Sequence, residues 1–356
     1  MKTQIIEGLT QEKYESYLTA RQYDELYWPA FFPIKNVNTL SGKTLIGAKG
    51  SRIAAMVISY NVKSPKLSRK SLETRVFDIP KVSIKREMDE NDILEQRITR
   101  FAQGNNAVLD DYYNDFDAVV DGCNARMEWF ALQALSTTYI QLTKTNNPLG
   151  IVNETVIDFG MDAANKKTVS VVWSAGNVAT MDPMADFKAV VKAARTKGLK
   201  FSKMLMDADA FDLMTAATLF KAYFLNTALS VTALIDLKTI NSLLKSYNLP
   251  EIVIIETSIG IEGKTGSATA TNPWSTSHIL FVPEVKQGNM FNGPIAEELE
   301  KPMDVMQAKN NNVLVSVKKD WDPVNVTTKG ECNVFPSWPN VNNCYNLYTL
   351  NASTWA

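Results

Sequence analysis

The 356-residue sequence contains one histidine and three cysteines, and these small numbers narrow the chemistry that it can support. His278 begins the apolar run His-Ile-Leu-Phe-Val, which is typical of a strand, so a histidine base would have to come from that one position. Cys123, Cys332 and Cys344 show no metal-ligand spacing, and their odd number favours free thiols in a reducing cytoplasm. The sequence therefore argues against a histidine-based catalytic triad and against a bound metal or other cofactor.

The sequence also lacks a long apolar run and a net charge. No segment approaches the roughly 18 to 20 apolar residues that a membrane-spanning helix needs, and residues 1–26 are too polar for a secretory signal. The 37 basic and 38 acidic residues give a net charge of −1, which favours neither nucleic acid nor a membrane surface as a partner. We expect a protein that is made in the cytoplasm.

One segment resembles an enzyme motif. Residues 251–267, EIVIIETSIGIEGKTGS, contain Gly263-Lys264-Thr265, which could end a phosphate-binding loop. That loop needs a glycine where Ser258 stands, and it must open a helix, whereas the residues that follow show no helical period. The Gly-Lys-Thr at residues 42–44 lacks the first glycine as well. We predict a surface loop between strands and keep a nucleotide-binding enzyme only as an alternative.

The clearest pattern that is present is a striped helix within residues 110–140. Its apolar positions alternate in spacings of four and three, which indicates one buried face: Phe116, Val120, Cys123, Met127, Phe130 and Ala134. Aspartates crowd the head of this segment, where the helix dipole favours negative charge, and they predict the N-terminal end: Asp110, Asp111, Asp115, Asp117 and Asp121. Without a calcium-loop spacing, these acids favour a solvated or subunit-facing surface over a metal site.

The first 45 residues have the composition of an arm. A short helical pattern covers residues 11–22, and Pro29 and Pro33 should then interrupt regular structure. Four aromatic residues in this stretch are too apolar to remain in water, so they must lie against the chain's own core or against a neighbouring subunit: Tyr27, Trp28, Phe31 and Phe32.

Residues 46–88 carry short strand-like pieces around a basic tip. Within residues 61–86 there are two acids, Glu73 and Asp78, and eight cations: Lys63, Lys66, Arg69, Lys70, Arg75, Lys81, Lys85 and Arg86. This basic loop could pair with the acidic head of the 110–140 helix in another copy. A solvated loop remains an equal alternative, and binding of nucleic acid is a weaker one because no aromatics lie among the cations.

The rest of the sequence predicts an α/β region followed by strands. Residues 155–290 alternate between helical and strand patterns, including one helix over DADAFDLMTAATLFKAYF and another that ends at Gly198. Strands are predicted over KFSKMLMD at 200–207, EIVIIET at 251–257 and HILFVPE at 278–284. Residues 300–356 return to extended pieces. The chain is long enough for two or more subdomains, and the fold class is α+β.

This order of parts resembles the major capsid proteins of tailed phages, specifically the lambda-type major head protein family. Five segments carry the resemblance, which spans nearly the whole chain: RVFDIPKVSIKREMDENDILEQR at 75–97, NARMEWFALQALSTT at 124–138, VVWSAGNVATMDPMADF at 171–187, HILFVPE at 278–284 and DWDPVNVTTKGECNVFPSWPNVNNCYNLYTL at 320–350.

The resemblance implies a Hong Kong 97-like fold with five parts. These are an N-terminal arm (1–45), an extended β loop (46–88), a peripheral domain with a long spine helix at about 110–137 (89–154), an axial domain (155–290), and peripheral return strands with the C-terminus (291–356). Family members are structural and not enzymes. Their hexamers and pentamers tile an icosahedral shell around packaged double-stranded DNA, which gives the expected location, a virion assembled in the host cytoplasm.

The resemblance also implies partners. We expect a separate scaffolding protein, because the loop begins near residue 46 and leaves no room for a fused one, together with a portal, packaged DNA held without sequence specificity and, as an option, a decoration protein. Twelve residues are candidates for contacts between subunits: Tyr27, Trp28, Phe31, Phe32, Lys63, Lys66, Arg69, Lys70, Arg75, Asp110, Asp111 and Asp115. A bacterial nanocompartment shell that encloses an enzyme is the alternative with the same fold.

Overall fold

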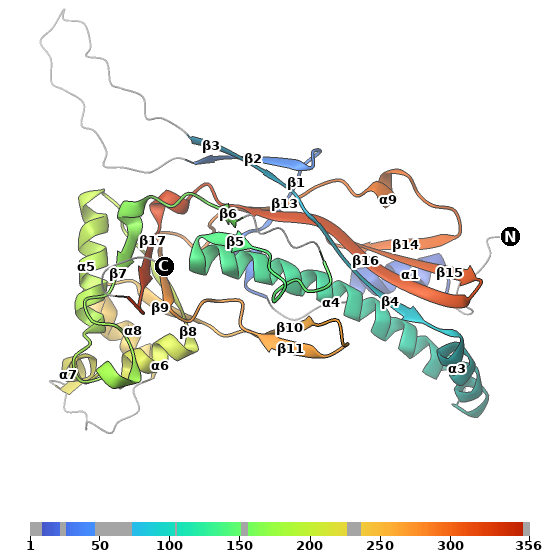
Figure 1. Ribbon diagram of the computed structural model, residues 1–356, viewed down its shortest axis with the longest axis horizontal. Coiled ribbons are helices and arrows are strands. Elements are labelled where there is room, and N and C mark those ends of the chain that lie inside the picture. Colours follow the sequence, from blue (N-terminus) through green and yellow to red (C-terminus); the bar gives the residue numbers. More distant parts are fainter. Residues whose placement is uncertain are drawn as a thin grey trace, which may run out of the picture. The chain divides into compact units, whose positions relative to one another are not determined.

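The computed structural model describes residues 9–21, 26–46, 73–103, 105–150, 156–225 and 236–351. The chain divides into two compact units (Figure 1). Unit 1 comprises Met1–Gly42, Val76–Phe130 and Asn289–Ser337, and unit 2 comprises Lys43–Arg75, Ala131–Gly288 and Trp338–Ala356. Both units combine helices with sheets, so the expected α+β class is confirmed.

Unit 1 is built on a sheet whose central strand is the 14-residue β16. The strand order is β1-β13-β16-β15-β14, and β4 pairs with the free side of β16 from Met88 opposite Val326 to Lys81 opposite Asn333. The strands are β1 (Ile34–Asn36), β4 (Lys81–Met88), β13 (Asn289–Asn292), β14 (Val305–Asn310), β15 (Val313–Trp321) and β16 (Val324–Ser337). The sheet thus joins three segments that are far apart in the sequence.

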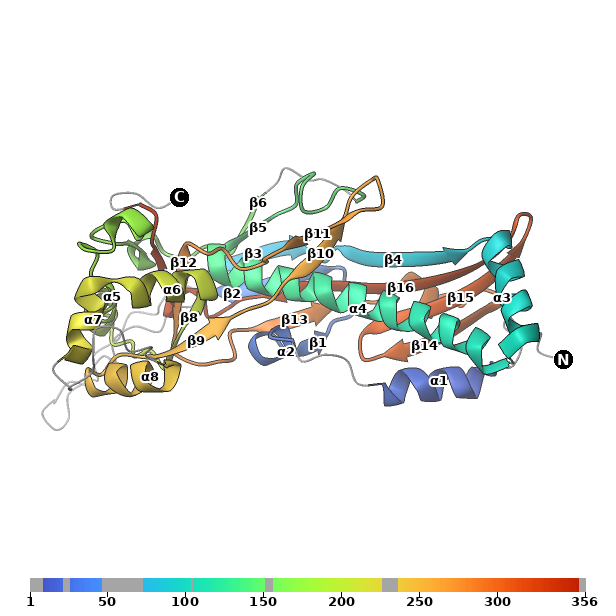
Figure 2. The same cartoon turned by 90° about the horizontal axis from the view of Figure 1, so that it is seen from below.

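The helices of unit 1 are α1 (Gln11–Ala20), α2 (Trp28–Phe31), α3 (Glu90–Gln103), α9 (Ala296–Leu299) and α4 (Asn105–Thr137), whose last residues belong to unit 2. In Figures 1 and 2, α4 lies along β16. The side chains of the predicted stripe are all buried, with exposed fractions of at most 2%, because this face of α4 packs on apolar neighbours. The striped helix is confirmed.

Two predictions for this region were wrong in detail. Helix α4 begins at Asn105, so the aspartates lie beyond its first turn and did not mark its end. The preceding Asn-Asn-Ala-Val-Leu includes good helix formers, which extend the helix, and an acidic cluster only favours an end without fixing it. Pro29 does not break α2 either, because it occupies the first turn, where a missing N–H costs no hydrogen bond.

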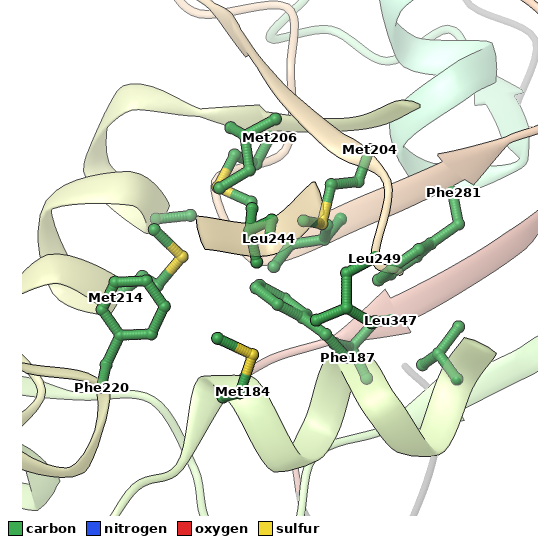
Figure 3. Close-up of a cluster of buried hydrophobic side chains, with 14 of the residues drawn as sticks. Met184, Phe187, Met204, Met206, Met214, Phe220, Leu244, Leu249, Phe281 and Leu347 are labelled. Carbon is green, nitrogen blue, oxygen red and sulfur yellow. The ribbon is translucent and has the colours of Figure 1, made fainter. Parts of the chain in front are cut away.

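Unit 2 contains a five-stranded sheet in the order β7-β17-β12-β8-β9. The strands are β7 (Lys166–Thr168), β8 (Lys203–Asp207), β9 (Glu251–Ile255), β12 (His278–Val282) and β17 (Tyr345–Tyr348), and the helices are α5 (Pro183–Thr196), α6 (Ala208–Ala216), α7 (Thr218–Leu225) and α8 (Leu237–Ser246). Figure 3 shows methionine, phenylalanine and leucine side chains from both the helices and the sheet meeting in one core.

The strands predicted over residues 200–207, 251–257 and 278–284 are confirmed as the shorter strands β8, β9 and β12. The helix that ends before Gly198 is confirmed as well, and Gly198 has a φ of +70° that suits glycine. The single helix predicted over residues 207–224 is wrong. Ala217 leaves the helical conformation, with ψ 127°, and the amide of Thr218 donates to the carbonyl of Val178 at 2.9 Å, so α6 ends and α7 begins. This long-range partner is not visible in the local pattern.

Three two-stranded ribbons complete the description. They are β2 (Ser41–Ile46) with β3 (Glu73–Asp78), β5 (Tyr139–Gln141) with β6 (Val156–Asp158), and β10 (Ile259–Glu262) with β11 (Ala268–Thr271). Short 3₁₀ turns lie at Ala163–Asn165, Ala175–Asn177 and Val341–Asn343. Among the helices in the described ranges, none has the length and apolar character to cross a membrane.

Candidate assembly surfaces

The aromatic arm is anchored to its own unit by a buried carboxylate. Glu128 of α4 accepts hydrogen bonds from the backbone amides of Tyr27, at 3.0 Å, and Trp28, at 2.8 Å. Burial raises the pKa of Glu128, and the two amides partly oppose that shift. Trp28, Phe31 and Phe32 are 6%, 4% and 0% exposed, so the arm lies against the chain's own core, which is the first of the two options that the sequence left open.

Helix α1 is held by a second set of contacts. The hydroxyl of Tyr14 donates to the carbonyl of Val315 at 2.9 Å, and the amide of Asn310 donates to the carbonyl of Leu18 at 2.6 Å. The hydroxyl of Tyr17 donates to Asp117 at 2.9 Å, and burial together with this carboxylate raises the pKa of Tyr17 to about 12. The arm is thus positioned by α4 and by the sheet.

The acidic head of α4 is partly paired within the chain. Asp115 is buried and accepts from Arg86 of β4 at 3.2 Å, and Asp117 pairs with Arg21 at 3.1 Å. The backbone of Asp110 and Asp111 is helical, and their side chains lie outside those that the structure describes. Of the acidic candidates, Asp115 therefore already has a partner in its own subunit.

The basic tip falls outside the described residues, which include neither Lys63 and Lys66 nor Arg69 and Lys70. Arg75 is described, and it binds locally: its guanidinium donates to Glu73 at 2.9 Å and to the carbonyl of Asp158 at 3.1 Å. The predicted role of these residues in contacts between subunits stays a prediction.

The two Gly-Lys-Thr sequences lie in a turn and in a strand. Gly263-Lys264-Thr265 forms the turn between β10 and β11, where the amide of Gly263 donates to the carbonyl of Ser267 at 2.9 Å. The described residues 259–282 contain no helix whose N-terminus could hold a phosphate. The predicted surface loop is confirmed. The second Gly-Lys-Thr lies in β2.

His278 is a buried residue of β12. Its Nδ1 lies 2.8 Å from Oγ of Ser275, and its ring contacts that of Tyr348 with centroids 4.8 Å apart. Burial lowers the pKa of His278 to about 4, so the imidazole is neutral near pH 7 and serves packing. Within the described ranges, no three or more His, Cys, Asp or Glu residues group together in a way that could hold a metal ion.

Sequence reasoning missed two features of unit 1, a cluster of ion pairs around a buried glutamate and an exposed tryptophan. Glu331 is 2% exposed, yet it pairs with Lys81 at 2.8 Å and with Lys329, which also reaches Glu297 next to the sheet. Trp321, at the end of β15, is 86% exposed. The tryptophan between two aspartates in KKDWDP was a usable signal for an exposed turn.

The whole fold is similar to that of solved phage proteins. A prophage protein from E. coli CFT073 described as a capsid protein matches with a TM-score of 0.58 and 14% identity, over 96% of this chain and 99% of that one. A phage-related protein from Bordetella bronchiseptica RB50 matches with a TM-score of 0.52 and 13% identity, over 96% and 97%. At these identities the likeness defines the fold, which is of the phage capsid class.

The sequence gives the more specific result. The family model for phage major capsid protein E matches residues 28–347, which is most of the chain. The chain therefore belongs to the phage major capsid protein E family. A comparison with curated proteins finds no significant match.

Proposed function

We propose that this chain forms the wall of an icosahedral phage head, in which its hexamers and pentamers enclose double-stranded DNA. The observation that carries the proposal is the family match over residues 28–347, supported by a fold similar to that of solved phage proteins. The expected five-part organisation, from arm to peripheral return strands, belongs to this proposal. A separate scaffolding protein, a portal and a decoration protein are its proposed partners in the host cytoplasm.

The proposed role is structural and not enzymatic. The one enzyme-like loop is a hairpin turn and the one histidine is buried and neutral, so neither supplies a catalytic group. A closed shell instead requires repeated interfaces between copies, each on the order of 1,200 to 2,000 Å² for stable association.

The proposed interface places the basic loop of one copy against an acidic surface of another. Asp110 and Asp111 are the stronger acidic candidates, because Asp115 is buried and bound to Arg86. In the arm, Tyr27 is half-buried, and it remains more accessible to a neighbour than Trp28, Phe31 and Phe32. Charge complementarity of this kind would set the register between copies.

Sedimentation of the purified protein tests this interface. Reversing three charges, with Lys66→Glu, Arg69→Glu and Lys70→Glu, should reduce the yield of fast-sedimenting particles while the far-ultraviolet circular dichroism is unchanged. The matched control keeps each charge, with Lys66→Arg, Arg69→Lys and Lys70→Arg, and should assemble normally. An unchanged particle yield from the charge-reversed chain would remove the loop from the interface.

A nanocompartment shell is the remaining alternative, because it would share the fold. The two differ in cargo: a phage head protects nuclease-resistant DNA when it is made with its packaging partners, whereas a nanocompartment encloses a protein. The contents of particles purified after nuclease treatment distinguish them.

A further inference from the structure

Helix α4 approaches the backbone of β16 without intervening side chains. A β-carbon placed on Gly330 would lie 2.7 Å from the carbonyl oxygen of Val119 and 3.0 Å from its Cβ. A β-carbon on Gly122 would lie 2.9 Å from Cδ1 of Ile84 in the neighbouring β4. The distance at Gly330 is too short for any residue other than glycine, because a backbone oxygen cannot move aside, whereas the end of the Ile84 side chain near Gly122 can shift. Gly330 therefore allows the helix to rest directly on β16.

Helix α4 and strand β16 cover the same length along their axes beyond this contact. From Val119 to Phe130 the helix rises eleven residues, or about 16 Å, and from Gly330 to Phe335 the strand rises five residues, or about 16 Å. At the far end the rings of Phe130 and Phe335 meet, with centroids 5.7 Å apart. The two elements therefore run alongside each other in the same direction.

This register brings two cysteines together. Cys123 lies one helical turn after Val119, and Cys332 lies two residues after Gly330 on the same face of β16. Both side chains are 0% exposed, and Cys123 is near enough to Cys332 to help raise the pKa of its thiol. The close approach at Gly330, next to this pair, suits the short Cα–Cα separation of about 4.4 to 6.8 Å that a disulfide requires.

We propose that Cys123 and Cys332 are an oxidation site, at which a disulfide forms between α4 and β16 once the folded chain leaves reducing surroundings. Disulfides are stable in oxidising compartments and on released particles, whereas the cytoplasm keeps such thiols reduced. The bond would join segments 209 residues apart, since 332 − 123 = 209. A closure of this length should strengthen unit 1 against unfolding.

The oxidant in this proposal is a small disulfide such as oxidised glutathione. During a local opening that exposes one sulfur, that cysteine attacks the oxidant as the thiolate and releases one glutathione thiol. The second cysteine then attacks the mixed disulfide and releases the other glutathione thiol. Two protein thiols become one disulfide, and their two protons end on the two released thiols. The contact with Cys123, together with burial, raises the pKa of Cys332, so the reaction should be slower than at an exposed cysteine.

Cys344 provides an internal comparison. It is also 0% exposed, but it belongs to unit 2, where its thiol donates to Oε1 of Gln287 at 3.0 Å. With an amide as its partner in place of a thiol, it should remain reduced under the same treatment.

The test incubates the folded, purified chain with oxidised glutathione over several days, blocks the remaining thiols after unfolding, and maps the peptides without reduction. The expected product has one free thiol, at Cys344, a peptide pair linked through Cys123 and Cys332, and a melting temperature several degrees above that of the reduced chain. Cys344→Ser should form the same link, and Cys332→Ser should not.

Three free thiols, glutathione adducts without the link, or a link that includes Cys344 would each overturn the proposal. A link that lowers the melting temperature would also contradict it, because it would show that the bond distorts the contact of α4 with β16. The wild-type chain decides these outcomes even if a variant does not fold. The measurement requires only the folded chain, so its result is separate from whether particles assemble.

Discussion

The two units bury their apolar residues in different ways. In unit 2, helices cover a five-stranded sheet, and the core is rich in flexible methionines, including Met184, Met204 and Met206. In unit 1, α4 rests directly on β16 at Gly330, and the ion pair of Arg86 with Asp115 joins the neighbouring strand β4 to the helix. The stability of unit 2 should therefore depend mainly on the volume of its core, and that of unit 1 on the close approach of two backbones.

The largest expected effect is in the core of unit 2. Phe187 is fully buried and contacts the ring of Phe281, with centroids 5.9 Å apart, so Phe187→Ala should lower the free energy of unfolding by about 3 to 5 kcal/mol. Chemical denaturation measures this loss. Lys238→Ala, at an exposed position of α8, is the control and should change stability by less than about 0.5 kcal/mol. A loss near that of the control would show that this core is loosely packed.

The next largest effect tests the backbone contact of unit 1. Gly330→Ala adds a β-carbon 2.7 Å from a backbone oxygen that cannot move aside alone, so it should cost about 1 to 3 kcal/mol. Gly263→Ala is the matched control, because its nearest neighbour would be 3.7 Å away, in ordinary contact. Equal stability of the two variants would contradict the close packing of α4 on β16.

The anchor of the arm should have a similar or smaller effect. Glu128→Ala removes the acceptor of the half-buried amide of Tyr27 and of the buried amide of Trp28, which should cost about 1 to 3 kcal/mol. Limited proteolysis should show faster cleavage within the arm than in the wild-type chain. Glu15→Ala, on the exposed side of α1, is the control. Unchanged cleavage of the arm would indicate that aromatic packing alone holds it.

The smallest effects are pH dependences of opposite sign in the two units. In unit 2, burial raises the pKa of Asp186, despite hydrogen bonds from Ser170 and Trp173. The folded chain therefore holds this proton more tightly than the unfolded one, and the contribution of Asp186 to stability should fall as the pH rises from 3.8 through the raised pKa. The Asp186→Asn variant should lack this dependence of stability on pH.

In unit 1, burial would raise the pKa of Glu331, but Lys329 and Lys81 together outweigh it and lower the pKa. Its contribution to stability should be present above the unfolded value of 4.5 and be lost as the pH falls through the lowered pKa. The Glu331→Gln variant should therefore be less stable than the wild-type chain near pH 7, and this difference in stability should disappear in acid. The free energy of unfolding of the wild-type chain, minus that of each variant, should be measured from about pH 3 to pH 7. If this difference changes with pH in the same direction for Asp186 and Glu331, the assignment is contradicted.

Local patterns predicted much of the fold. The stripe from Phe116 to Ala134 follows from helical periodicity, and the strand within residues 251–257 follows from a short continuous apolar run. The start of α4 was not predicted, because the residues before the aspartates also permit a helix. The break at Ala217 was not predicted, because it depends on the distant carbonyl of Val178.

Long-range features lay beyond sequence reasoning. The pairing of β4 with β16 and the contact of Cys123 with Cys332 join segments more than 200 residues apart, and no local pattern encodes them. The buried carboxylate anchor at Glu128 was not predicted either, because an acid within a helical pattern usually marks its solvated side. The Hong Kong 97-like label and the contacts between subunits stay predictions.

Negative-stain electron microscopy of the chain, expressed alone and then with its neighbouring genes, tests the central claim most directly. The account predicts capsomer rings or uniform closed shells in at least one of the two preparations. A folded chain that stays monomeric in both would contradict the proposal that this protein builds a phage head.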